Sequence, residues 1–156
     1  MRVRVIAVGT RMPPWVRSAS SEYLERLTSA PGVVLREIAP AARAGAAGAR
    51  TAIAAEGRRL LGELGRGDHV VALDEQGAQL STRELAEWLN TRMHSGEDLA
   101  FVIGGPDGLA PEVLARSNTR LALSRLTLPH ALARVLLLEQ LYRARALLVH
   151  HPYHRD

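Results

Sequence analysis

The chain has 156 residues and a mass of 17.0 kDa, a size that predicts a single domain over residues 1–156 with a sizeable core. It has no cysteine, which excludes disulfide bonds and thiolate metal sites. The formal net charge is +4, and all 20 basic residues are arginine. An arginine-only, alanine-rich composition is typical of a GC-rich genome. Arginine also pairs well with phosphate, so a nucleic-acid partner is permitted without being required.

Neither the start of the chain nor its most apolar stretch has the pattern of a targeting or membrane segment. Residues 2–5 alternate arginine and valine, which predicts a strand and not the apolar core of a signal peptide. The apolar stretch 131–149 is interrupted by Arg134, Glu139 and Arg143, so it is not expected to cross a membrane. We therefore expect a cytoplasmic protein.

Predicted strands and helices alternate along the chain. Apolar runs predict strands over residues 2–8, 33–38, 69–73 and 99–103, with a last strand-like segment over 121–128. Helical spacing predicts helices over residues 14–28, 50–64, 111–115 and 129–149, and another that opens at a capping box, Ser81 to Glu84, and runs through Leu89. This alternation predicts an α/β fold with a mainly parallel sheet and helices on both faces.

Two stretches between these elements are predicted to be irregular. Residues 40–49 are rich in glycine and alanine and carry one charged residue, Arg43, which is typical of a mobile loop. Residues 74–77, Asp-Glu-Gln-Gly, predict a turn.

The turns that follow the buried strands are candidate ligand sites, because ligands of parallel α/β proteins bind at the carboxyl ends of strands. Residues 104–108, Gly-Gly-Pro-Asp-Gly, would let a ligand approach the backbone, although a tight turn explains them as well. They lack the Gly-Lys-Ser/Thr of a P-loop. Asp74 either accepts a ribose hydroxyl or caps a turn. The extended segment 124–129 either reads a purine edge with its backbone or simply links strand and helix.

The last predicted helix carries the most polar chemistry in an apolar setting. It is apolar nearly all round, so we expect burial on all sides, partly against a second subunit. His130 and Arg134 share one face at i, i+4, and Glu139 and Arg143 form a favoured i, i+4 pair. Each of these side chains could have either a structural role or a role in a functional site.

The histidines at the end of the chain raise the question of zinc. His150 and His154 have a spacing that binds zinc on a helix, but Pro152 is expected to end the helix between them. No carboxylate with metal-ligand spacing lies nearby, so no metal is predicted. A tail of tyrosine, histidine and arginine is better matched to stacking on a base and holding phosphate.

Together these motifs resemble one family, the ribosomal RNA large subunit methyltransferase H family of the SPOUT class of α/β-knot methyltransferases. The resemblance covers the chain from end to end. It is carried by the start MRVRVIAVGT, Glu56-Gly57, Leu73-Asp74 with Gly77 and Ser81-Thr82, FVIGGPDGL (101–109), LSRLTLPH (123–130), RVLLLEQLYRA (134–144) and HPYHR (151–155).

The resemblance implies a fold, a reaction and partners. It implies a C-terminal trefoil knot, which periodicity alone does not predict. It also implies transfer of a methyl group from S-adenosylmethionine to N3 of a pseudouridine in 23S rRNA of the assembled ribosome, by a homodimer. The implied cofactor pocket is lined by backbone at Leu73, Gly104, Leu123, Ser124, Arg125, Leu126, Thr127 and Leu128.

The polar residues near the end of the chain then receive candidate roles in this reaction. His130 is a candidate base or hydrogen-bond partner for N3–H, and Arg143 would offset negative charge on the uracil ring. Tyr153 would stack on or orient the base, while Arg155 and Arg134 would hold phosphate or support the site. In a dimer, the tail of one subunit would complete the pocket of the other.

Two other classes of function are weighed against this one. A ribosome-binding protein that has kept the fold without catalysis would have no cofactor affinity. A metal-dependent hydrolase built on the terminal histidines would lose activity with a chelator. The intact 104–108 turn argues against the first class, and the missing carboxylate ligands argue against the second.

Overall fold

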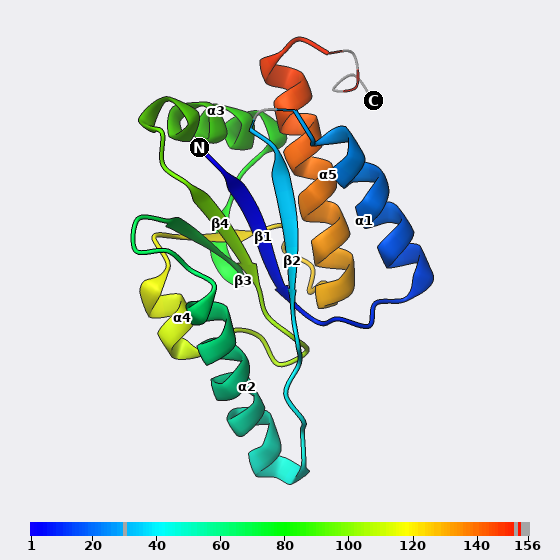
Figure 1. Cartoon of the computed structure of the whole chain (residues 1–156), viewed down its shortest axis with the longest axis vertical. Helices are drawn as coiled ribbons and strands as arrows, with labels where there is room; N and C mark the ends of the chain where they lie inside the picture. The colour runs from blue at the N-terminus through cyan, green and yellow to red at the C-terminus, as the bar shows by residue number, and fades with distance from the viewer. Residues whose placement is uncertain (30, 152, 154–156) are drawn as a thin grey trace.

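The computed structural model describes residues 1–29, 31–151 and 153, and a parallel sheet runs through its centre (Figure 1). The sheet has five strands in the order β2-β1-β4-β3-β5, and every neighbouring pair is parallel. The strands are β1 Val3–Val8, β2 Val33–Ile38, β3 His69–Gln79, β4 Leu99–Ile103 and β5 Thr119–Ala122. The predicted α/β class is therefore confirmed.

Helices cover both faces of the sheet, as predicted (Figure 1). They are α1 Pro14–Arg26, α2 Gly45–Gly62, α3 Thr82–Ser95, α4 Pro111–Arg116 and α5 His130–Leu148. Helices α1, α3 and α5 pack on one face, and α2 and α4 pack on the other. The predicted capping box opens α3, because Glu84 N–H donates to the Ser81 hydroxyl and Ser81 N–H donates to the Glu84 carboxylate.

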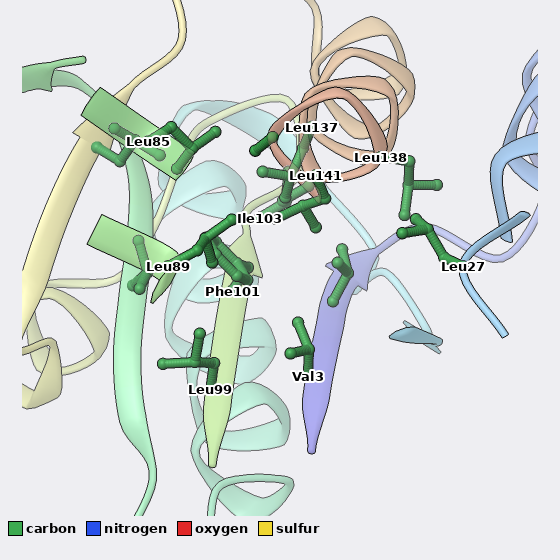
Figure 2. Close-up of a cluster of buried hydrophobic side chains, with 14 of the residues drawn as sticks. Val3, Leu27, Leu85, Leu89, Leu99, Phe101, Ile103, Leu137, Leu138 and Leu141 are labelled. Carbon is green, nitrogen blue, oxygen red and sulfur yellow. The ribbon is translucent and has the colours of Figure 1, made fainter. Parts of the chain in front are cut away.

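The larger core lies between the sheet and helices α1, α3 and α5. Figure 2 shows Leu137 and Leu141 of α5 reaching toward Phe101 and Ile103 of β4, with Leu138 of the same helix beside Leu27. These six side chains are at most 4% exposed. Every residue of β4 is buried, as expected for a central parallel strand with helices on both sides. This core fixes α5 against the strands whose ends form the site.

Two predicted boundaries are wrong, and each difference has a physical cause. Helix α2 begins at Gly45 and not at 50, so half of the predicted loop is helical. Alanine has the highest helix propensity, and this outweighs the scattered glycines. The last strand-like segment ends at Ala122 and not at 128, because residues 123–128 leave the sheet and form a wall of a pocket.

The predicted turn at 74–77 is an interruption within β3, which continues to Gln79. Leu73 and Ala78 both pair with Leu121 of β5, so residues 74–77 bulge out of the ladder. Glycine is required at position 77, since a Cβ there would lie 2.6 Å from the carbonyl carbon of Arg120. The bulge directs two carboxylates, Asp74 and Glu75, toward the carboxyl edge of the sheet.

Helix α5 is not buried on all sides within one chain. Leu132, Val135 and Leu136, which share one face at i, i+3 and i+4, are only partly buried. None of the helices in the described part of the chain has the length and apolar character needed to span a bilayer. A search of the same residues finds no group of three His, Cys, Asp or Glu side chains arranged to hold a metal.

Candidate active site

A pocket of about 680 Å³ lies at the carboxyl edge of the sheet. Its walls come from the ends of β3 and β4, the 104–108 turn, the segment after β5 and the first turn of α5. Parallel strands bring these segments together, because all their carboxyl ends meet at one edge. The volume lies within the range of small-molecule sites, about 300–1,000 Å³.

Most of the residues predicted to bind a cofactor line this pocket. Those that do are Leu73, Gly104, Leu123, Ser124, Leu126, Thr127 and Leu128. Arg125 is exposed and is not part of the lining. The chain turns here, with Leu126 N–H donating to the Ser124 hydroxyl at 2.9 Å, and this turn leaves Arg125 on the outside.

The glycines of the 104–108 turn are required by close backbone packing. A Cβ at Gly104 would lie 2.6 Å from both the carbonyl carbon and the oxygen of Gly108. Gly108 itself has a φ of 85°, a conformation that side chains disfavour. The turn is therefore tight, and it also presents backbone without side chains to the pocket. Both interpretations of this sequence, a tight turn and a ligand-accessible backbone, therefore apply.

Carboxylates from the β3 bulge stand at the rim of the pocket. The Asp74 carboxylate accepts a hydrogen bond from Gln76 N–H at 3.1 Å, which is the turn-capping arrangement. Thr127 donates to the Glu75 carboxylate at 3.3 Å and so connects the bulge to the opposite wall. Sequence reasoning missed Glu75, because a turn residue carries no signal of which wall it will face.

An arginine from the segment before α2 fastens the 104–108 turn to the rest of the protein. Arg43 donates to the Glu56 carboxylate at 2.8 Å and to the Asp107 carboxylate at 2.5 Å. The Glu56 side chain is 2% exposed, so Arg43 satisfies a buried carboxylate. The three residues lie far apart in the sequence, so no local sequence pattern predicts that they form a cluster.

His130 lines the pocket from the start of α5. Burial lowers the pKa of its imidazole, and the positive charges of Arg134 and Arg43 lower it further. The ring is therefore neutral at pH 7, with one nitrogen able to accept a proton. It forms no hydrogen bond with any residue in the described part of the chain.

Arg134 has a structural role beneath His130, and its predicted contact with phosphate is wrong. Its side chain is 2% exposed and forms an ion pair of 2.5 Å with Glu37 of β2. It also donates to the backbone carbonyl of Gly9 at 3.0 Å. Full burial leaves no surface for a phosphate. Arg134 instead ties α5 to the ends of β1 and β2, in keeping with the prediction that it supports the site.

Arg143 lies toward the other end of α5, and Tyr153 lies beyond that end. The Arg143 guanidinium donates to Glu139 at 2.8 Å and lies 4.9 Å from the centre of the Tyr153 ring. Tyr153 packs edge-on against Tyr142, with ring centres 4.6 Å apart. The pKa of the Tyr153 hydroxyl is raised, mainly by burial and also by its hydrogen bond with Tyr23, so the hydroxyl stays protonated.

One chain thus does not bring all the predicted catalytic residues together. His130 is at the pocket, whereas Arg143 lies 13 residues further along α5, about 20 Å at 1.5 Å per residue, and Tyr153 lies beyond the end of the helix at Leu148. Arg155 and His154 lie outside the described residues.

Comparisons with solved structures agree with this fold. A probable methylase family protein from Haemophilus influenzae superposes with a TM-score of 0.57 at 14% identity, over 97% of this chain and 69% of that one. A probable methyltransferase from Bordetella pertussis gives a TM-score of 0.56 at 18% identity, over 92% and 95% of the two chains. At these identities the likeness concerns the fold alone.

Sequence comparisons are more specific. A family model described as "Predicted SPOUT methyltransferase" matches residues 1–154. The ribosomal RNA large subunit methyltransferase H of Burkholderia lata is 46% identical over 155 residues, 99% of each chain, and that of Alkalilimnicola ehrlichii is 50% identical over the same shares. The chain therefore belongs to the SPOUT methyltransferases and, among them, to the ribosomal RNA large subunit methyltransferase H family.

Proposed function

We propose that this protein transfers a methyl group from S-adenosylmethionine to N3 of a pseudouridine in 23S rRNA of the assembled ribosome. The observation that carries the proposal is the pocket of about 680 Å³, lined by a neutral His130 that has no hydrogen-bond partner among the described residues. Such a site offers a place for a methyl donor beside a group able to accept a proton. Work on ribosomes implies a cytoplasmic protein.

The pocket fits the donor in shape and charge. Leu73, Leu123 and Leu128 supply apolar walls for a purine, and the glycine turn supplies backbone that a ligand can approach. Asp74 and Glu75 at the rim suit a ligand with positive charge. When bound, S-adenosylmethionine supplies an electrophilic sulfonium methyl group, which needs no metal ion for activation.

The protein's own contribution is to orient the acceptor and to take its proton. N3–H of pseudouridine is a weak acid, so methylation at that nitrogen needs a partner that removes or shares the proton. The neutral His130 imidazole, which lines the pocket, can accept it. Alignment of donor and acceptor lowers the barrier further.

Arg143, Tyr153 and Arg155 act on the acceptor from the partner subunit in this proposal. Arg143 lies about 20 Å along α5 from His130 at 1.5 Å per residue, and Tyr153 lies beyond the end of the helix, so neither can serve the pocket of its own chain from its position in the structure. Two antiparallel α5 helices would bring the tail of each subunit toward the pocket of the other. Arg143 would then offset charge on the ring, Tyr153 would orient it, and Arg155 would hold phosphate.

The surface of α5 and α1 supports a homodimer. Leu132, Val135 and Leu136 present a partly buried apolar face on α5, and Val149, just beyond its end, is 64% exposed. Helix α1 packs beside α5 (Figure 1) and carries Trp15, which is 55% exposed. An apolar surface of this kind is typical of a subunit interface.

The test is methyl transfer from labelled S-adenosylmethionine to ribosomes that lack the modification, with isolated 23S rRNA in parallel. We expect label in 23S rRNA from intact ribosomes, at N3 of a pseudouridine by mass spectrometry, and none in isolated RNA. Binding of S-adenosylmethionine without transfer would contradict the acceptor. Absence of binding would favour the non-catalytic ribosome-binding class, and activity abolished by a chelator would favour the hydrolase class.

A further inference from the structure

A second pocket, of about 500 Å³, lies beside the first one. It is lined by the end of β1 and the segment that follows it, Gly9 to Met12, together with Pro40 and Arg43. His130 and Pro106 line both pockets, so they form the partition between them. The imidazole of His130 comes close to β1, since its Nε2 would lie 3.9 Å from a Cβ on Gly9.

The charges around this pocket leave one arginine uncompensated. The charge of Arg43 is neutralised by Glu56 and Asp107, and the charge of the buried Arg134 is neutralised by Glu37. Arg11 is exposed at the pocket and forms no ion pair or hydrogen bond with any residue that the structure describes. The entrance is therefore positive and suits an anion such as a phosphate.

The walls of the second pocket suit a planar ring. Met12, Pro40 and Pro106 provide apolar surface, and Gly9 leaves backbone without a side chain. Nucleobases taken out of a helix are bound between aromatic or apolar side chains, and arginine is among the side chains that contact phosphates in nucleic-acid complexes. A pocket of about 500 Å³ is within the range of small-molecule sites, about 300–1,000 Å³.

We infer that this second pocket is the acceptor site, which takes an RNA nucleotide with its base between Met12 and Pro106 and its phosphate on Arg11. The inference rests on the proposed function. The base would face His130 from one side of the partition while the donor occupies the other. Proton acceptor, methyl donor and target nitrogen would then meet at a single residue, His130.

The first test replaces Arg11 by alanine and uses Arg17→Ala as the matched control, because Arg17 is exposed on α1 and lines neither pocket. With ribosomes lacking the modification, Arg11→Ala should raise KM about tenfold, the usual effect of losing one charge-assisted hydrogen bond. The slope of log KM against log salt should fall by about 0.7–0.9, the value of one phosphate contact. The Kd for S-adenosylmethionine should not change.

Each other outcome is equally informative. A KM and salt slope for Arg11→Ala equal to those of Arg17→Ala would overturn the inference. A raised Kd for S-adenosylmethionine would assign the second pocket to the donor and overturn it too. Failure of the unmodified enzyme to label ribosomes would instead contradict the proposed function, so the two failures are distinguishable.

A second variant fills the pocket. Met12→Trp should lower kcat on ribosomes at least about tenfold, because the base would no longer fit, while the Kd for S-adenosylmethionine stays within about twofold. Met93→Trp is the matched control, since Met93 is 40% exposed on α3 and lines neither pocket. Thermal melting of both variants checks the fold. Unchanged kcat for a folded Met12→Trp would exclude the pocket as the acceptor site.

Discussion

At the scale of single residues, His130 combines position with an altered proton affinity. Burial and two neighbouring arginines lower its pKa below the ordinary value of 6.5, so the ring is neutral at pH 7 and available as a base. His130→Gln keeps the polar shape but cannot accept a proton. We expect kcat for methyl transfer to fall by about 10²–10⁴, with S-adenosylmethionine still bound.

The pH dependence of the unmodified enzyme gives an independent check on His130. Because its pKa is lowered, the imidazole is protonated, and so lost as a base, only at acidic pH. We therefore expect kcat to stay constant above pH 6.5 and to fall below it. His94→Gln is the control, because His94 is exposed on α3. A kcat midpoint above pH 6.5, or an unchanged midpoint in a partly active His130→Gln, would point to a different base.

Arg134 shows how a charged residue on an apolar helix can be structural. It is 2% exposed, and its partner Glu37 is 38% exposed. Arg134→Met leaves Glu37 unpaired and the Gly9 carbonyl without its donor, so we expect unfolding free energy to fall by about 3 kcal/mol.

Urea denaturation measures this loss of stability, and Glu37→Gln is the companion variant. Glu37→Gln leaves the buried Arg134 guanidinium without its counter-charge, so it should also lower the unfolding free energy, by about 3 kcal/mol. Equal stability of Arg134→Met and the unmodified protein would mean that the ion pair contributes nothing to the fold.

At the scale of elements, the sequence predicted best where local chemistry decides the structure. The capping box at Ser81 marks the start of α3, and the apolar run 99–103 is β4. Prediction failed where distant contacts decide. The bulge at 74–77 depends on how β5 approaches Gly77, and the order around Arg43 depends on Glu56 and Asp107.

The same distinction applies to the site. The cofactor wall 123–128 and the 104–108 turn were found because each is a continuous motif next to a strand. The second pocket was missed, because it joins the end of β1 to Pro40, Arg43 and His130. The rule that ligands bind at the carboxyl ends of parallel strands, applied to Gly9, would have indicated it.

The capping box gives a prediction at this scale. Ser81→Ala removes the acceptor for Glu84 N–H and should lower the free energy of unfolding by about 1 kcal/mol in chemical denaturation. Ser18→Ala is the control, because Ser18 is exposed within α1 and alanine is the better helix former there. It should leave stability unchanged or raise it slightly. Equal effects of the two substitutions would mean that the cap does not stabilise α3.

At the scale of the whole molecule, α5 connects two chemically different regions. Its first turn borders the pockets, and beyond its last turn Tyr153 donates a hydrogen bond to Tyr23 of α1. The larger core keeps this helix rigid, so the distance between the regions is fixed. Within one subunit the tail therefore cannot reach the pocket without leaving its own contacts, and a second subunit is the simplest way to unite them.

This arrangement predicts complementation between two inactive variants. Gly104→Val should disrupt the donor pocket, because a side chain at Gly104 would collide with the backbone of Gly108. Tyr153→Ala should disable the tail. In a mixed dimer with a tail acting on the partner's pocket, one site would combine an intact pocket with an intact tail.

The two variants are co-expressed with different affinity tags, and purification on both tags in turn isolates the mixed dimer. We expect it to recover about half of the methyl transfer of the unmodified dimer, because one of its two equivalent sites is intact. Each variant alone should be inactive, dimeric by light scattering and folded by circular dichroism. If each tail served its own pocket, every site in the mixed dimer would contain one defect and no activity would return. The assay therefore decides which subunit supplies the tail, since only exchange between subunits restores a complete site.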